Sequence, residues 1–201
     1  MKRICTLAVI LACAWMAKAD RMSELRDSIL SNISGARIER TDTLDVMKFG
    51  ARPDGYSDCR KAIEKAIAKA NAKGGGVVNF PKGEYLVKGP INLLSNVILN
   101  LEKDATIRFD PSPELYPIVS TSWEGTYCYN YSPMIRAYEV KNVGITGDGL
   151  IDGNAMTTFA TWRPNQKPAQ QRSRQMNHDG VPTDQRRFGE GDWLRPQLIQ
   201  F

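Results

Sequence analysis

Short apolar runs broken by Gly, Pro, Asn and Asp follow one another along much of the chain. The clearest example is Asn142 to Gly153, in which Val143 and Ile145 alternate with non-apolar positions before Gly147-Asp148-Gly149 interrupts the run. Gly and Asp tolerate the left-handed backbone of tight corners. One β-hairpin around Asp-Gly is the simplest alternative, but a second corner follows too soon to leave room for paired arms. The pattern therefore predicts short strands that turn and continue.

Parts of this stretch recur elsewhere in the chain. Asn96-Val97 and Asn142-Val143 open similar apolar segments 46 positions apart. We interpret this separation as two coils of about 23 residues, within the usual repeat range of solenoids. Pro196 to Phe201 also repeats the form of Pro133 to Tyr138, which predicts an Asn-Val or Asn-Ile pair at about position 205 of a longer protein. Stacked repeats of this kind predict an all-β protein, a parallel β-helix.

One helix is predicted ahead of these strands. Its apolar stripe is formed by Cys59, Ala62, Ile63, Ala66, Ile67 and Ala70. Ser57 or Asp58 is the expected cap, and Gly74-Gly75-Gly76 ends the helix. We expect this short helix to cap the open N-terminal end of the solenoid, whose unpaired backbone groups would otherwise pair with other chains.

The chain begins with the pattern of an export signal. Lys2 and Arg3 precede an apolar run, and Ala17-Lys18-Ala19 fits a cleavage site before Asp20. Residues 1–19 are therefore predicted to be a signal peptide, too short for a membrane span, and the protein to be periplasmic or extracellular. The alternative is a lipid anchor at Cys13, and no other membrane association is expected.

The remaining sequence divides into two predicted parts. Residues 20–43 should form an N-terminal helix and linker, because Met22, Leu25, Ile29 and Ile33 mark one helical face between Arg21 and Ile33. Residues 44–201 should form the β-helix.

Charge and cysteine content narrow the function classes. Loss of Lys2, Arg3 and Lys18 with the signal lowers the formal charge from +5 to about +2, so the protein lacks the basic excess of a nucleic-acid binder. Cys59 and Cys128 would remain. An exported pair can form a disulfide, but these two fall in different predicted elements, and their pairing is left open.

Several segments together resemble polygalacturonases, which are family 28 of the glycoside hydrolases. The segments are Asp45 to Asp58, the Ala-Ile helix, Gly74 to Val78, Phe80 to Tyr85, Ser95 to Glu102 and Ile145 to Gly153. The likeness covers Asp45 to Gly153 and resumes at Arg195 to Phe201. It implies the N-terminal coils of a right-handed parallel β-helix that degrades pectin, truncated at its C-terminal side, with an acidic plant polysaccharide (pectin or galacturonan) as partner.

The motifs that carry the family's chemistry are absent from this sequence. The resemblance implies inverting hydrolysis by Asp carboxylates in Asn-Thr-Asp and Asp-Asp motifs, near Gly-His-Gly and Arg-x-Lys. Inversion needs an acid for the leaving oxygen and a base for water. Here Asp148 and Asp152 are better explained as corner residues, and His178 as a loop residue. No catalytic residue, metal ligand or cofactor is expected in this chain, and the catalytic carboxylates are expected beyond residue 201.

Residues 154–194 differ in character and are predicted to be a basic loop insert in the solenoid. Basic residues outnumber acidic ones there and at Arg195: Arg163, Lys167, Arg172, Arg174, Arg186, Arg187 and Arg195 against Asp179, Asp184, Glu190 and Asp192. Guanidinium groups pair with carboxylates, so Arg172 and Arg174 are candidate binding residues for a galacturonan. Trp162 and Trp193 are candidate stacking faces for a sugar. The alternative is a solvated loop with a small apolar anchor.

The sequence favours an exported hydrolase that cuts α-galacturonosyl linkages in pectin. One alternative is a pectate-lyase-type enzyme on the same scaffold, which would need Ca²⁺ ligands and a basic residue for proton abstraction; no acidic cluster has that spacing. The other is a non-catalytic glycan-binding or adhesin β-helix.

Overall fold

The computed structural model describes residues 21–32 and 42–201. The chain forms two units, residues 1–37 and 38–201, which are considered separately. In the first, residues 21–32 form a helix with Met22, Leu25 and Ile29 exposed. Ile33 and the predicted signal peptide lie outside the described residues. Within the described ranges, no helix is both long and apolar enough to cross a membrane.

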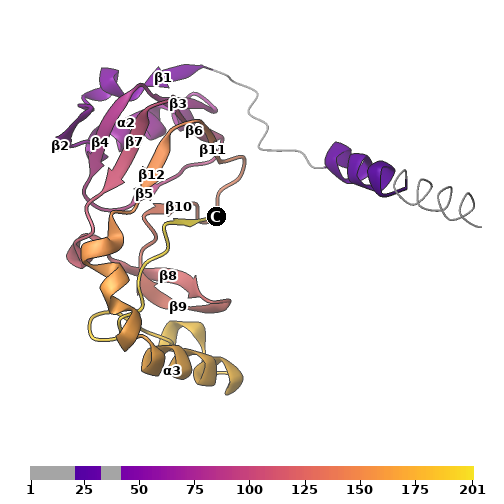
Figure 1. Cartoon of the computed structure of the whole chain (residues 1–201), viewed down its shortest axis with the longest axis vertical. Coiled ribbons are helices and arrows are strands. Elements are labelled where there is room, and N and C mark those ends of the chain that lie inside the picture. The colour runs from indigo at the N-terminus through magenta and orange to yellow at the C-terminus, as the bar shows by residue number, and fades with distance from the viewer. Residues whose placement is uncertain (1–20, 33–41) are drawn as a thin grey trace, which may run out of the picture. The chain divides into compact units, whose positions relative to one another are not determined.

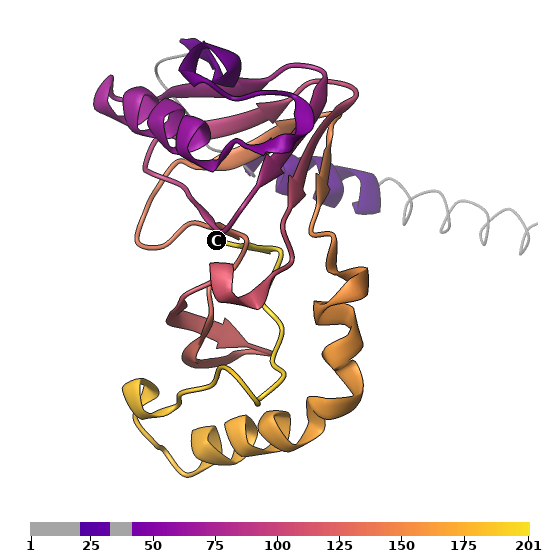
Figure 2. The ribbon, with the colours of Figure 1, turned by 90° about the vertical axis from the view of Figure 1, so that its left-hand side faces the viewer.

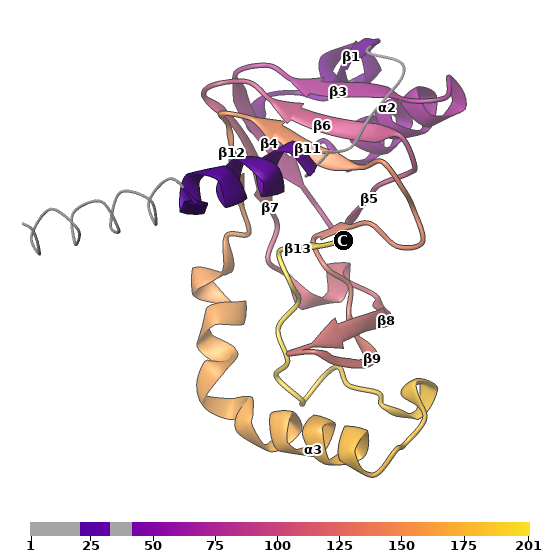
Figure 3. The same cartoon turned by 90° about the vertical axis from the view of Figure 1, so that its right-hand side faces the viewer.

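The second unit contains three parallel sheets that wind into a β-helix (Figures 1 and 3). One sheet has the order β1-β3-β6-β11, with bounds Thr43–Asp45, Gly76–Phe80, Val97–Leu101 and Gly144–Gly147. A second has the order β12-β7-β4-β2, with bounds Leu150–Asp152, Ala105–Phe109, Gly83–Val87 and Asp54–Asp58. The third has the order β13-β10-β5, with bounds Ile199–Gln200, Ile135–Arg136 and Ile91–Asn92. The predicted fold class is confirmed.

Our count of coils is wrong. Gly144 of β11 lies directly opposite Ile98 of β6, so a spacing of 46 residues is one coil and not two. The preceding coil is shorter, since Gly76 lies opposite Val97 at a spacing of 21 residues. An antiparallel hairpin of β8 (Ile118–Trp123) and β9 (Thr126–Tyr131) accounts for the additional length.

The register at the chain's end also differs from the prediction. Ile135 lies opposite Ile199, a spacing of 64 residues. Phe201 therefore corresponds to Ala137 and not to Tyr138. With a spacing of 64 residues, the Asn pair that we predict for a longer protein is expected at about position 206 and not 205.

The core lies between the sheets. Alternate strand residues point inward, and the buried side chains include Phe80, Tyr85, Leu99, Ile107 and Phe109. Helix α2 (Arg60–Ala72) buries the predicted alanine and isoleucine stripe against the first strands. It begins later than predicted because residues 54–58 pair with β4 as strand β2. Asp58 still accepts a hydrogen bond from the Arg60 amide, at 3.0 Å.

Residues 154–194 are largely helical, which corrects the prediction of a loop. They contain η3 (Ala155–Thr157), η4 (Phe159–Asn165), α3 (Lys167–His178) and η5 (Thr183–Gln185). Figure 2 shows this insert lying with the β8–β9 hairpin beside the coils. The two share a separate apolar cluster of Trp123, Cys128, Ala169, Phe188 and Leu194. That cluster supplies the tertiary contacts which the narrow apolar stripe of α3 needs.

Candidate functional site

The insert is held in place by aromatic packing. Phe159 and Trp162 are both buried on η4, with ring centroids 4.9 Å apart in an edge-to-face arrangement. Phe159 also meets Tyr116 of the coil at 5.9 Å. After Pro164 the chain turns into α3, with Pro168 in its first turn, where a missing amide hydrogen breaks no helical bond. The start of α3 is thereby fixed against the coils.

The two predicted binding arginines both have carboxylate partners. Arg172 lies 2.6 Å from Asp192 and its guanidinium covers the ring of Phe188. Arg174 lies 2.8 Å from Glu124 at the tip of the hairpin. Because each charge is compensated, neither arginine is as available to a polyanion as the sequence indicated.

The two predicted stacking tryptophans contact each other but differ in exposure. Trp162 is only 9% exposed and packs among Phe159, Tyr131 and Trp193, so it is a packing residue and not a free stacking face. Trp193 is 39% exposed and borders a cavity of about 580 Å³. Glu114 and Glu190 line the same cavity, which opposes an anionic sugar there.

Some of the other arginines are held by contacts within the protein, and others could meet an anionic ligand. Arg186 is buried and donates to the Val181 carbonyl at 2.6 Å and to the Asn177 side chain at 2.7 Å. Arg187 covers the ring of Tyr129. Arg163 of the insert and Arg195 just after it have no carboxylate partner among the described residues and face the same pocket, so they are the guanidinium groups best placed to meet an anion.

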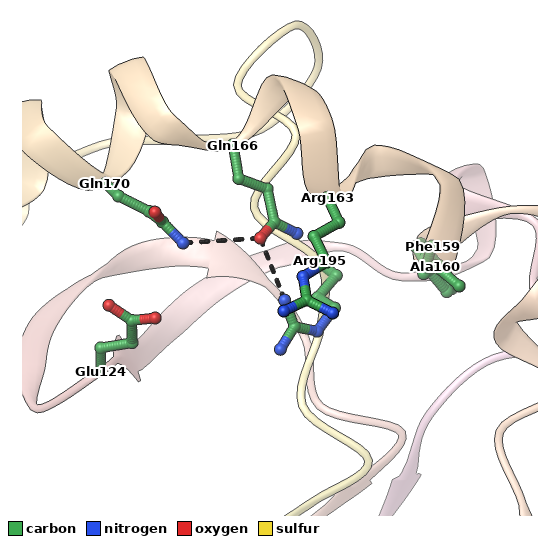
Figure 4. A pocket seen from close by; sticks show the side chains of 7 residues that line it. All are labelled: Glu124, Phe159, Ala160, Arg163, Gln166, Gln170 and Arg195. Atoms are coloured by element: carbon green, nitrogen blue, oxygen red, sulfur yellow. Dashed lines mark hydrogen bonds between the residues drawn. The ribbon is translucent and has the colours of Figure 1, made fainter.

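Arg163 and Arg195 line one pocket of about 670 Å³ (Figure 4). We call it the donor pocket; its other lining residues include Glu124, Phe159, Gln166 and Gln170. Arg195 is positioned by Leu194, which is fully buried, and its guanidinium lies over the ring of Trp123 at 5.1 Å. The pocket thus brings together η4, α3, the hairpin tip and the chain just after the insert.

Gln166 links the two sides of the donor pocket. It is 2% exposed, and its side-chain oxygen accepts from Arg195 Nη1 at 3.0 Å and from Gln170 Nε2 at 3.5 Å. Its own Nε2 is buried without a partner among the described residues. Sequence reasoning grouped Arg163 and Arg195 with the other basic residues and missed Gln166. One glutamine among several in a polar segment gives no signal of burial.

Two of the acidic side chains hold backbone turns, and the histidine ends a helix. Hydrogen bonds from the Ser57 and Tyr56 amides and from the Ser57 hydroxyl lower the pKa of Asp54 to about 2. Asp152 accepts from the Asn154 amide at 2.7 Å, as a corner residue does. His178 ends α3 and does not lie in a loop, and its Nδ1 is 3.0 Å from Asp179.

The described part of the chain offers neither a metal cluster nor a disulfide. No three His, Cys, Asp or Glu side chains gather in residues 21–32 and 42–201 in a way that could hold a metal ion. Cys59 and Cys128 are free and buried, in separate apolar clusters. Burial raises the pKa of both thiols, that of Cys128 to about 11, so neither is an activated nucleophile.

Known proteins share parts of this sequence and fold. Residues 43–168 match the family described as "Rhamnogalacturonase A/epimerase, pectate lyase-like". The structure of a hyperthermoactive exopolygalacturonase from Thermotoga maritima aligns with a TM-score of 0.82 and 35% identity, over 89% of this chain and 42% of that one.

Two curated relatives share shorter stretches. The exopolygalacturonase of Zea mays is 30% identical over 124 residues, which is 61% of this chain and 27% of that protein. Plasmin and fibronectin-binding protein A of Streptococcus pneumoniae is 43% identical over 89 residues, which is 44% of this chain and 12% of that protein.

This chain therefore spans less than half of each of these relatives. The family match covers most of the β-helix and the start of the insert, and the polygalacturonase structure extends the likeness across nearly the whole chain. The chain belongs to the rhamnogalacturonase A/epimerase family of pectate lyase-like proteins, with the fold of the polygalacturonases.

Proposed function

We propose that this chain is the N-terminal part of an exported glycoside hydrolase that cuts α-galacturonosyl linkages in pectin. The observation that carries the proposal is the alignment with the Thermotoga maritima exopolygalacturonase, at 35% identity over 89% of this chain. That alignment covers about twice as much of this chain as the 44% shared with the Streptococcus pneumoniae protein, and it leaves too few residues unaligned to omit the insert. The signal-like first 19 residues motivate export, to the periplasm or outside the cell.

In this proposal the reaction is an inverting hydrolysis. A carboxylic acid protonates the leaving oxygen while a carboxylate on the opposite face activates water, and the two stand roughly 6.5–9.5 Å apart. The sequence holds none of the family's acid motifs, and several described carboxylates are engaged in corners and ion pairs. The acid and base are therefore assigned to residues outside these 201.

The contribution of this chain is to build the first coils and to hold substrate. Its substrate-holding part is the insert with the hairpin, where guanidinium and amide donors gather. These groups bind and orient a sugar carboxylate; they transfer no proton.

The test compares this chain with a longer protein that continues past Phe201. We expect the longer protein to release reducing sugar from polygalacturonate, with inversion at the anomeric carbon visible by NMR. The 201-residue chain should release none above a mock preparation.

Three results would contradict the proposal. Hydrolysis by the 201-residue chain alone would place the acid and base inside it. An unsaturated product from the longer protein would identify a lyase. Glycan binding without any bond cleavage would favour the adhesin alternative, which the Streptococcus pneumoniae relative motivates.

A further inference from the structure

The donor pocket contains a hydrogen-bond donor whose direction is fixed. Two donors, Arg195 Nη1 and Gln170 Nε2, converge on the Gln166 side-chain oxygen. Reversing the amide would set its NH₂ group against both of them, so the contacts assign the oxygen and nitrogen. Gln166 Nε2 is therefore a donor, and it is buried without an acceptor among the described residues. Such a group is costly unless a ligand or water satisfies it.

Two guanidinium groups border the same space. Arg163 and Arg195 are both exposed at the pocket, from opposite sides of Gln166 in the sequence, and neither is paired with a carboxylate in the described part of the chain. Figure 4 shows both side chains reaching the region below Gln166. Amide and guanidinium donors that meet in one cavity favour an acceptor with several lone pairs.

One acid also lines the pocket. Glu124 lies in the lining, and its carboxylate is compensated by Arg174 at 2.8 Å. The two available guanidinium groups therefore leave the pocket with a net positive charge, which favours an anion. The choice of a carboxylate as that anion rests on the proposed function.

We propose that the donor pocket binds the carboxylate of one uronate residue, through Arg163, Arg195 and Gln166 Nε2. The cavity of about 670 Å³ has the size of a small-ligand site. The choice of a galacturonate rests on the proposed function, since each unit of galacturonan carries one carboxylate.

The experiment measures binding of galacturonate to the protein by calorimetry, with galactose, the methyl ester of galacturonate and inorganic phosphate as comparison probes. We expect binding of galacturonate only, weakened by salt. Arg163→Gln and Gln166→Met should each weaken it by roughly tenfold, because each removes one donor to a charged acceptor. Thermal unfolding of each variant checks that the fold is retained.

Arg172→Gln is the matched control, since it removes an equal charge from the same insert at a residue outside the pocket. It should leave the affinity within about threefold, because exposed paired charges contribute little. Equal weakening by Arg172→Gln and Arg163→Gln would reduce the effect to general charge and overturn the site. Phosphate binding as tight as galacturonate binding would overturn the assignment to a uronate.

This result is separable from the proposed function. Binding measured this way needs no bond cleavage, so an inactive longer protein that still binds galacturonate through Arg163 would refute the hydrolase and keep the site. If the longer protein is an active hydrolase and its affinity for galacturonate is unchanged in Arg163→Gln and Gln166→Met, the site is refuted and the hydrolase is kept.

Discussion

Gly147 lies so close to Leu101 of the preceding coil that a Cβ atom at Gly147 would collide with the Leu101 carbonyl group. Its φ of +95° lies in the left-handed region as well. The corner between β11 and β12 therefore depends on glycine for two reasons, space and backbone conformation.

We expect Gly147→Ala to destabilise the protein by about 2–4 kcal/mol, because strain and a steric clash with backbone act together. Gly125→Ala is the control: Gly125 has a φ of +82°, and no atom lies within 4 Å of its Cβ position. It should cost only about 1 kcal/mol. Urea unfolding monitored by circular dichroism measures both, and equal losses would show that close stacking of the coils contributes nothing.

Arg186 joins the end of the insert to the hairpin and has a structural role. It donates to Val181, Asn177 and, at 3.4 Å, to the Tyr127 carbonyl. Arg186→Ala should lower the free energy of unfolding by about 2–4 kcal/mol, because buried acceptors lose charged donors. Arg187→Ala, at the exposed neighbour, should change it by less than about 1 kcal/mol. Equal midpoints in urea for the two variants would contradict this role.

Asp54 gives the stability of the protein a dependence on acid pH. Its folded-state pKa is lowered from 3.8 to about 2 by hydrogen bonds from Ser57 and Tyr56. The stabilisation is therefore complete above the unfolded pKa and is lost as pH falls through the folded one, between about pH 4 and pH 2. Asp54→Asn should flatten the fall of the unfolding midpoint in this window. An unchanged slope in Asp54→Asn would contradict this role.

Apolar side chains are exposed on or beside two edge strands of the coils. Leu150 lies on β12, and Leu198 and Phe201 flank β13; all three are exposed, and both strands end their sheets in the described part of the chain. Exposed edges recruit other chains, so we expect the 201-residue chain to self-associate as its concentration rises. Leu150→Lys should reduce this association in sedimentation experiments, whereas Met156→Lys, on η3, should not. A strictly monomeric parent chain would disprove the idea.

The sequence was informative about the coils because their signals are local. Corners such as Gly147-Asp148-Gly149 and the alternation in Val97 to Leu101 depend on the backbone and on the two faces of a strand. The number of coils, by contrast, depends on which distant strands pair, and no local signal gives that. A spacing of 46 residues fits two short coils or one long one, and only the pairing of Ile98 with Gly144 decides.

The candidate site was likewise predicted only as far as local signals reach. Composition pointed to the insert as the basic part of the chain, but it could not tell which arginines are free. The partner of Arg172 is 20 residues away and that of Arg174 is 50 residues away. The helix α3 was missed because only Ala169 and Ser173 are buried along it, which leaves too few apolar positions to reveal the helical period.

The unequal coil lengths have a consequence for how the protein folds. Closing the 21-residue coil between β3 and β6 costs less chain entropy than closing the 64-residue coil between β10 and β13, by about 1 kcal/mol if the loop were flexible. The early coils, covered by α2, should therefore form first and serve as a template for the later ones. Synthesis delivers the coils in this same order, so each new strand emerges with its partner already in place.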